Sequence, residues 1–239
     1  MNITLPDGST RELSEGSSGY DLALSIGKGL AKAAVAISID GKQQDIHDSI
    51  TKDSSVSIIT IDSPEGLEIM RHTLTAQVLA RAVKNLYPDA KLAIGPTIND
   101  GFYYDFLFNK AISSDDIPKI ENEMRNIIKS GDTINKSLKS QKDAIKLFKE
   151  RKEDYKIEII QDSDQKEDFQ IYQQGDSDFI DLCKGPHLPN LSLIGPFKLT
   201  KVAGAYWRGN SSNEMLTRVY GTAWNTEKEL NAHLEAIEE

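Results

Sequence analysis

The sequence feature that most restricts the fold is a long amphipathic segment from Leu67 to Leu86. Its apolar residues recur every three or four positions and form one stripe, which predicts a helix with a single buried face. These residues are Leu67, Met70, Leu74, Val78, Ala82, Val83 and Leu86. Tyr87-Pro88 ends the pattern, and Ser63-Pro64-Glu65-Gly66 breaks the chain just before it. Such a helix must bury its stripe, so the chain has to supply a second layer that covers it.

The residues before this helix form a small separate unit. The pattern strand, strand, helix, strand, strand runs over Ile3–Leu5, Thr10–Leu13, Gly19–Leu30, Val35–Ile39 and Ser55–Ile61. Pro6-Asp7-Gly8-Ser9 supplies the turn of the first hairpin, and Asp21 favours the first turn of the helix. This order is typical of a ubiquitin-like β-grasp module and predicts a first domain over residues 1–62.

The residues after the long helix mix strands and helices. Strands are expected at Lys91–Gly95, Gly101–Phe108, Tyr155–Ile160, Phe169–Tyr172, Phe179–Cys183, Phe197–Val202 and Leu216–Trp224. Helices are expected at Asp115–Lys129 and Gln141–Arg151. Thr226-Glu227-Lys228-Glu229 has the spacing of a capping box and starts a final helix that reaches the last residue, as in a fragment of a longer chain.

The expected fold class is therefore α+β. A small β-grasp domain at 1–62 precedes a larger α+β domain at 63–225, whose mostly antiparallel sheet packs on the long helix. Residues 226–239 begin a linker helix.

Composition and charge exclude several classes to which the protein could belong. A chain of 239 residues can bury a hydrophobic core without disulfide bonds or bound metal ions. Its one cysteine, Cys183, excludes an internal disulfide. The sequence has no signal peptide and no run near the roughly 18 apolar residues of a membrane helix, so we expect a cytoplasmic protein that contacts no membrane. A net charge of −9 argues against a broad nucleic-acid surface. The lysine-rich run from Lys136 to Lys156 is most simply a solvated helix face, with a local RNA-binding patch as the alternative.

Three segments are candidates for chemistry. They are Asp181–His187, the pair Ile94–Pro96 and Asn99–Asp105, and Ala203–Asn210. The first places the thiol of Cys183 and the imidazole of His187 four residues apart around a Gly-Pro turn. In the third, small residues let another backbone or a ligand approach closely. Taken singly, each segment is more often a structural turn, a strand entrance or a packed hairpin than a site.

Taken together, these strings are far more specific. They read Ala93-Ile94-Gly95-Pro96, Gly101-Phe102-Tyr103-Tyr104-Asp105, Cys183-Lys184-Gly185-Pro186-His187, Gly204-Ala205-Tyr206-Trp207-Arg208-Gly209 and Tyr220-Gly221-Thr222-Ala223-Trp224. In this order and spacing they resemble bacterial threonyl-tRNA synthetases over nearly the whole chain. The resemblance implies a TGS-like β-grasp domain followed by the tRNA-editing domain. It implies no cofactor, because zinc and ATP would belong to the family's catalytic domain, which has no counterpart here.

The resemblance further implies hydrolysis of the ester in mischarged seryl-tRNA(Thr), without aminoacylation. Serine lacks one methyl of threonine, which is worth only roughly 1–3 kcal/mol of discrimination, so a second site must remove serine. The implied partners are the tRNA(Thr) acceptor end carrying serine and the remainder of the synthetase. The matching catalytic positions are Lys156, Cys183 and His187, and the matching substrate-binding positions are Tyr104, Asp181, Thr73 and Gly95.

Each of these positions has an implied role. Lys156 would hold the carbonyl or ribose oxygens, and Asp181 would bind the seryl amino group. Cys183 and His187 would orient water or shuttle a proton.

The long helix departs from the family pattern. The family has Arg-His-x-x-x-His there, whereas this sequence reads Arg71-His72-Thr73-Leu74-Thr75-Ala76-Gln77. Alignment from the left keeps His72 at the first histidine, whereas alignment from the right puts Thr73 at the first histidine and Gln77 at the second. One residue is thus inserted and the second histidine is absent, and His72 and Gln77 are both candidate catalytic positions. On a regular helix, positions five apart differ by about 140°, so His72 and Gln77 face different sides. We expect Thr73 and Gln77 to line the pocket while His72 points aside; a π-bulge that brings both together is the alternative.

Two rival interpretations stay open. His72, Cys183 and His187 offer three soft ligands for zinc, as in the related alanyl editing proteins, but glutamine is a poor fourth ligand and we expect no metal. The other rival is a binding module that grips the tRNA acceptor end and has lost hydrolysis. It is favoured by Gln77, which cannot exchange a proton near neutral pH.

Overall fold

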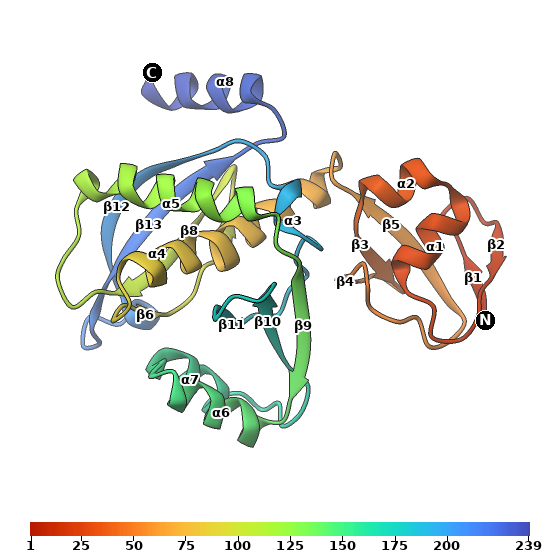
Figure 1. The fold of residues 1–239 in the computed structure, drawn as a ribbon, viewed down its shortest axis with the longest axis horizontal. Helices are drawn as coiled ribbons and strands as arrows, with labels where there is room; N and C mark the ends of the chain where they lie inside the picture. Colours follow the sequence, from red (N-terminus) through yellow and green to blue (C-terminus); the bar gives the residue numbers. More distant parts are fainter.

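The computed structural model of the protein describes residues 1–239, and its N-terminal part is a five-stranded sheet with two helices on one face (Figure 1). The strands are β1 (Asn2–Thr4), β2 (Thr10–Glu12), β3 (Ala34–Ile39), β4 (Lys42–Asp45) and β5 (Ser54–Thr60), and the helices are α1 (Gly19–Ile26) and α2 (Lys28–Ala33). The strand order is β2-β1-β5-β3-β4, in which β1 and β5 run parallel. Ile3, Leu22 and Ile37 belong to its own apolar core. The predicted β-grasp domain is confirmed.

Strand β4 is an addition that the sequence pattern did not predict. Its residues, Lys42-Gln43-Gln44-Asp45, are all polar, so no apolar alternation marks them as a strand. The strand forms because it pairs antiparallel with β3, whose apolar residues are buried. This pairing places Asp45 at the end of the edge strand.

The long helix consists of three consecutive segments. They are α3 (Pro64–Thr73), a π-helical stretch η1 (Leu74–Leu79) and α4 (Ala80–Leu86). The hydroxyl of Ser63 accepts a hydrogen bond from the Gly66 N–H and caps the N-terminus. The wider π turn accommodates one extra residue without ending the helix. The expectation of a regular helix is therefore wrong in this stretch. The π turn of the alternative is present, but no side-chain hydrogen bond brings His72 and Gln77 together, because His72 contacts Cys183 and Gln77 contacts Gln174.

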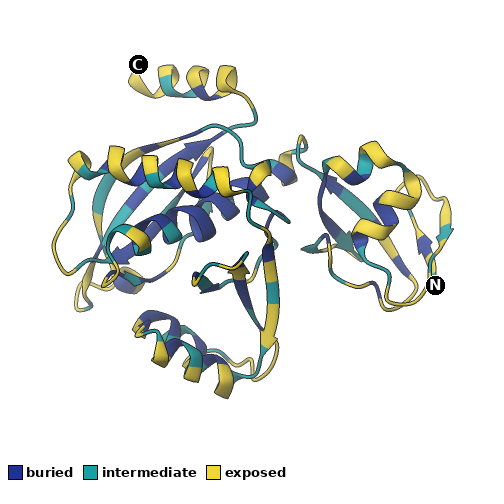
Figure 2. Cartoon of the chain, viewed as in Figure 1, coloured by how far each residue is buried: buried dark blue, intermediate teal, exposed yellow.

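An antiparallel sheet covers the long helix. It contains β12 (Phe197–Tyr206), β13 (Met215–Ala223), β8 (Gly101–Leu107) and β6 (Lys91–Leu92) in that order, and β7 (Thr97–Ile98) pairs with β8. Helix α5 (Ile117–Ser130) packs beside α4 and contacts β12. The largest apolar core lies between these layers and includes Met70, Val78, Phe102 and Val219 (Figure 2).

A smaller, three-stranded sheet lies beside the antiparallel sheet that covers the long helix (Figure 1). Its order is β11 (Ile180–Leu182), β10 (Phe169–Gln174) and β9 (Ile134–Lys139), and the paired helices α6 (Gln141–Glu150) and α7 (Asp154–Gln161) lie at its end. Single turns of 3₁₀ helix lie at Ser114–Asp116, Leu191–Leu193 and Trp207–Gly209, and α8 (Glu227–Glu238) ends the chain. No helix of the chain has both the length and the apolar character needed to cross a bilayer.

One predicted strand is wrong: residues 155–160 form helix α7 instead. The sequence Tyr155-Lys156-Ile157-Glu158-Ile159 alternates apolar and polar residues, which mimics a strand. In the structure, Tyr155 and Ile159 pack with Trp207, one helical turn apart, whereas Ile160 packs with Phe148 of α6. The helix therefore buries two sides, and its apolar residues do not form the single stripe by which a helix is predicted.

Candidate active site

Two imidazoles and the only thiol meet where the long helix faces the loop after β11. The Nε2 atom of His72 lies 2.9 Å from Sγ of Cys183. The rings of His72 and His187 stack with their centroids 4.7 Å apart and their planes 2° from parallel. We call these three residues the thiol–imidazole cluster. The expectation that His72 points aside is wrong, because its Nε2 atom contacts Cys183 and its ring stacks on His187.

Thr73 fixes the proton on His187. The Thr73 hydroxyl donates its one proton to the carbonyl oxygen of Ile69 at 2.8 Å, so it can only accept from the Nδ1 atom of His187, 3.1 Å away. It also accepts from the Leu188 N–H at 3.0 Å. His187 therefore carries its proton on Nδ1 and has a free electron pair on Nε2. That Nε2 atom is buried and has no hydrogen-bond partner.

Both imidazoles are held in the neutral form. Burial lowers the pKa of His72 to about 4, and the charge of Lys156 acts in the same direction against nearby carboxylates. Burial also lowers the pKa of His187, a shift that the neighbouring Cys183 opposes. At neutral pH each ring can therefore accept a proton or orient a water molecule.

A buried ion pair adjoins the cluster. The Nζ atom of Lys156 in α7 lies 3.0 Å from Oδ1 of Asp181 in β11, and the two side chains are only 4% and 1% exposed. The Tyr104 hydroxyl donates to Oδ2 of Asp181 at 2.9 Å, and the Leu182 N–H donates to Oδ1 at 2.8 Å. Burial raises the pKa of Asp181, and the Lys156 ammonium opposes that rise. Three donors thus occupy three of the roughly four acceptor positions of the carboxylate.

Two glycines allow the close packing of this region. A Cβ atom on Gly95 would lie 2.2 Å from Cδ2 of Tyr104, so the predicted substrate-binding Gly95 lies directly against the Tyr104 ring. Gly185, between Cys183 and His187, has a φ of +62°, and a Cβ atom there would lie 2.2 Å from the Tyr172 hydroxyl. Side chains at either position would move an aromatic ring of the site.

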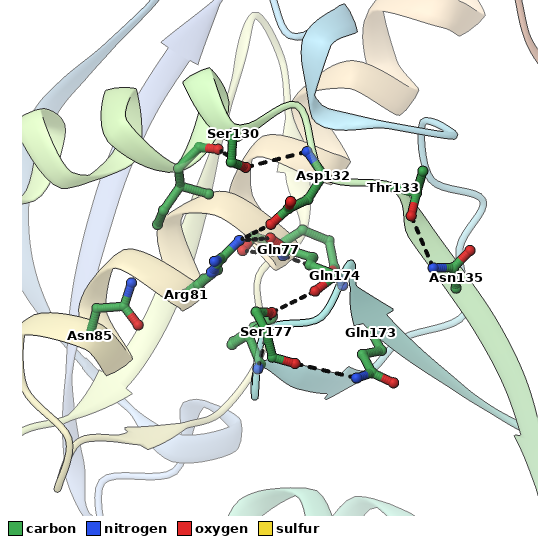
Figure 3. Close-up of polar contacts among 12 residues, drawn as sticks. Gln77, Arg81, Asn85, Ser130, Asp132, Thr133, Asn135, Gln173, Gln174 and Ser177 are labelled. Carbon is green, nitrogen blue, oxygen red and sulfur yellow. Dashed lines mark hydrogen bonds and ion pairs between the residues drawn. The ribbon is translucent and has the colours of Figure 1, made fainter.

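Gln77 has no side-chain hydrogen bond to any of the other predicted site residues. Its main-chain oxygen and Oε1 both accept from the side-chain amide of Gln174, at 2.8 Å and 3.0 Å (Figure 3). Arg81 donates to Gln174 and to Asp132 in the same network. His72 and Thr73, which precede the π turn, therefore contact the loop after β11, while Gln77, within the turn, joins the long helix to β10.

A groove of about 620 Å³ lies beside the ion pair. It runs past Glu153 and Ile180, which are close to Lys156 and Asp181 in the sequence. Arg81, Lys84 and Arg151 contribute positive charge to its lining, and none of the thiol–imidazole cluster lines it. The groove is therefore a surface feature separate from the thiol–imidazole cluster.

The geometry of the cluster does not suit a metal ion. The nitrogen and sulfur atoms of His72, Cys183 and His187 lie within 4.8 Å of one another. An imidazole binds a metal through an electron pair in its ring plane, but the two ring planes are 2° from parallel and stacked. Parallel planes do not meet, so both rings cannot direct electron pairs at one ion without rotating.

Two contacts of this site were not predicted. The Asp45 carboxylate of the first domain accepts from the His187 N–H at 2.9 Å, and the Tyr172 ring lies edge-on to His187 with centroids 4.5 Å apart. Tyr172 lies in a predicted strand, but no pattern in the sequence marks it as part of a site. Asp45 is separated from His187 by 142 positions, so no local spacing could reveal the contact.

Two models of known protein families match parts of the chain. Residues 1–60 match the TGS domain, and residues 170–220 match the threonyl and alanyl tRNA synthetase second additional domain. The second of these two models is described for threonyl and alanyl tRNA synthetases.

The similarity extends to particular relatives over the whole chain. It is 48% identical over 238 residues to the threonine–tRNA ligase of Acidithiobacillus ferrooxidans, covering 100% of the chain and 36% of that protein. It is 50% identical over 237 residues to the enzyme of Hahella chejuensis, covering 99% of the chain and 37% of that protein. The chain therefore spans about a third of the length of these relatives and resembles the N-terminal region of bacterial threonine–tRNA ligases. The resemblance predicted from the sequence is confirmed.

Proposed function

We propose that the chain hydrolyses the ester of mischarged seryl-tRNA(Thr), as the editing part of a threonine–tRNA ligase. The observation that carries this proposal is the free Nε2 of His187, held beside His72 and Cys183 and next to the buried Lys156–Asp181 pair. Ester hydrolysis needs a proton acceptor for water and a positive group for the developing oxyanion. These residues supply both.

In the proposed reaction, His187 is the proton carrier. Its Nε2 accepts a proton from the water that attacks the seryl carbonyl, and then gives that proton to the ribose oxygen as the ester bond breaks. The hydrogen bond from Nδ1 to Thr73 keeps the free electron pair on Nε2 throughout. His72 and Cys183 orient the attacking water, since both lie within 4.8 Å of the His187 nitrogen and neither is needed as a covalent nucleophile.

Lys156 and Asp181 bind the aminoacyl group in this proposal. The Lys156 ammonium stabilises the oxyanion or the ribose oxygens, and the remaining acceptor position of Asp181 receives the seryl ammonium. Because the pair is buried and Gly95 lies tightly against Tyr104, a small side chain fits better than one with an extra methyl. The parallel imidazole rings favour a reaction that uses no metal.

The alternative of a binding module without hydrolysis rested on the loss of a helix histidine. The contact of His72 with Cys183 weakens this argument, because one helix imidazole lies in the cluster although the second is absent. No other feature of the structure favours the alternative.

Deacylation of seryl-tRNA(Thr) by variants of the chain tests the proposal. We expect His187→Ala to lower the rate by about a hundredfold or more, because general acid–base catalysis contributes roughly 10²–10⁴-fold. His47→Ala, at an exposed position of the first domain, is the matched control and should leave the rate unchanged. A chelator should also leave it unchanged. Equal rates for the His187 and His47 variants would remove His187 from the mechanism, and loss of activity with the chelator would show that a metal takes part.

A further inference from the structure

Asp45 connects the first domain to the proposed catalytic loop of the second. Its Oδ1 atom accepts from the main-chain N–H of His187 at 2.9 Å, and its Oδ2 atom accepts from the Tyr172 hydroxyl at 2.8 Å. Asp45 ends β4, and both partners lie in the second domain. The side chain is 14% exposed, so these charge-assisted bonds are largely protected from water.

The two partners of Asp45 hold different sides of the same loop. Tyr172 lies opposite Asp181 in the β10–β11 pair, and its ring meets His187 edge-on at 87°. Its hydroxyl lies so close to Gly185 that a Cβ atom on residue 185 would clash with it. Burial and the charge of Asp45 raise the pKa of Tyr172, so the hydroxyl stays protonated and remains a donor. Asp45 therefore constrains the segment from Gly185 to His187 through the main chain and through a ring.

A second carboxylate in the same interface supplies a comparison. Lys136 of β9 lies 2.7 Å from Oδ2 of Asp48 and 3.4 Å from Oδ2 of Asp45. Asp48 thus contributes an ion pair between the two domains but makes no hydrogen bond to the loop of Cys183 and His187. Removal of Asp48 is therefore expected to weaken the interface alone, whereas removal of Asp45 is expected to release the loop as well.

We infer that Asp45 is a positioning residue of the editing site, so that the first domain completes the site of the second. The hydrogen bond to the His187 N–H fixes the position of the His187 imidazole relative to His72. The hydrogen bond to the Tyr172 hydroxyl fixes the position of the Tyr172 ring, which packs against that imidazole. This inference rests on the proposed hydrolysis for its kinetic consequence. Its geometric content, that Asp45 restrains the loop, does not depend on the reaction.

The kinetic test compares three variants in seryl-tRNA(Thr) deacylation. Asp45→Ala should lower kcat by about tenfold to a hundredfold with little change in KM, since a misplaced catalytic group costs that much even without lost substrate contacts. Asp45→Asn keeps an acceptor for the His187 N–H and should recover most of kcat. Asp48→Ala should keep the kcat of the unmodified chain. Equal kcat for Asp45→Ala and Asp48→Ala would overturn the inference.

The second test uses Cys183, the only cysteine, and does not depend on hydrolysis. Iodoacetamide should alkylate Cys183 several-fold faster in Asp45→Ala than in Asp48→Ala, because the released loop exposes the thiol. Circular dichroism melting checks that both variants are folded; if Asp45→Ala is not, Asp45→Ser and Asp48→Ser are compared instead, because the shorter serine side chain also removes the carboxylate. Equal alkylation rates would overturn the restraint of the loop. Faster alkylation in a chain that never deacylates seryl-tRNA would keep the restraint and overturn the proposed function.

Discussion

Acid should destabilise this protein in a way that can be traced to His72. The folded state holds the imidazole neutral, with a pKa of about 4, whereas the unfolded chain restores the ordinary value of 6.5. Between these two values, only the unfolded state binds the proton. Stability that is fully present above pH 6.5 is therefore lost as the pH falls toward 4.

The size of this effect follows from the two pKa values. At pH 5 the unfolded imidazole is almost fully protonated and the folded one is not, which costs about 2 kcal/mol relative to pH 7. At pH 4 the cost rises to about 3 kcal/mol, and further acid adds less than about 0.5 kcal/mol from His72. His187, whose pKa burial also lowers, contributes in the same direction.

Urea unfolding as a function of pH measures the effect. The free energy of unfolding should decrease more from pH 7 to pH 5 in the unmodified chain than in His72→Asn. The two decreases should differ by about 2 kcal/mol. His72→Asn also loses the contact with Cys183 at every pH, so the slopes and not the absolute values are compared. His47→Asn, at an exposed position, should keep the full slope. Parallel curves for the unmodified chain and His72→Asn would refute the burial argument for this imidazole.

Three further substitutions test the packing of the site by urea or thermal unfolding. Lys156→Met leaves the Asp181 carboxylate buried without its cation and should cost about 3–5 kcal/mol. Gly95→Ala places a methyl against the Tyr104 ring and should cost about 1–3 kcal/mol. Gln77→Met should change stability by less than about 1 kcal/mol, because the Gln174 amide keeps the main-chain oxygen of Gln77 as its acceptor and an unpartnered buried amide is removed.

Each of these three predictions has a control variant or a result that would contradict it. Lys156→Met combined with Asp181→Leu should recover part of the loss, since no buried charge is then left unpaired. Gly29→Ala, in an exposed helix with open space around it, should be neutral or stabilising, and equal losses at Gly29 and Gly95 would contradict the contact with Tyr104. A loss above about 2 kcal/mol in Gln77→Met would mean that the Gln77 amide has a partner after all.

The elements that could be predicted from the sequence are those with a strong local pattern. The stripe from Leu67 to Leu86 has one apolar face, and the first domain has turn residues between alternating strands. Helix α7 could not be predicted, because its apolar residues serve two different cores. Strand β4 could not be predicted either, because only its pairing with β3 makes it a strand.

The site itself was accessible only through the family resemblance. His72 and Cys183 are separated by 111 positions, and Tyr104 and Asp181 by 77, so no local spacing brings them together. The inserted residue in the long helix could be seen in the sequence, but whether the helix absorbs it depends on packing. The stacking of His72 on His187 and the burial of all six residues of η1 accompany the π turn. Asp45 carried no signal because its role arises only when the two domains meet.

The most direct test of the proposed editing function is the deacylation of two charged tRNAs by the unmodified chain. Seryl-tRNA(Thr) and threonyl-tRNA(Thr) are incubated separately with the protein, and loss of the labelled amino acid is followed over time. The account predicts that seryl-tRNA is hydrolysed at least about tenfold faster, since a pocket that is too tight for one methyl discriminates by roughly 10–200-fold. Equal rates for the two tRNAs, or a rate for seryl-tRNA no greater than that without protein, would contradict it.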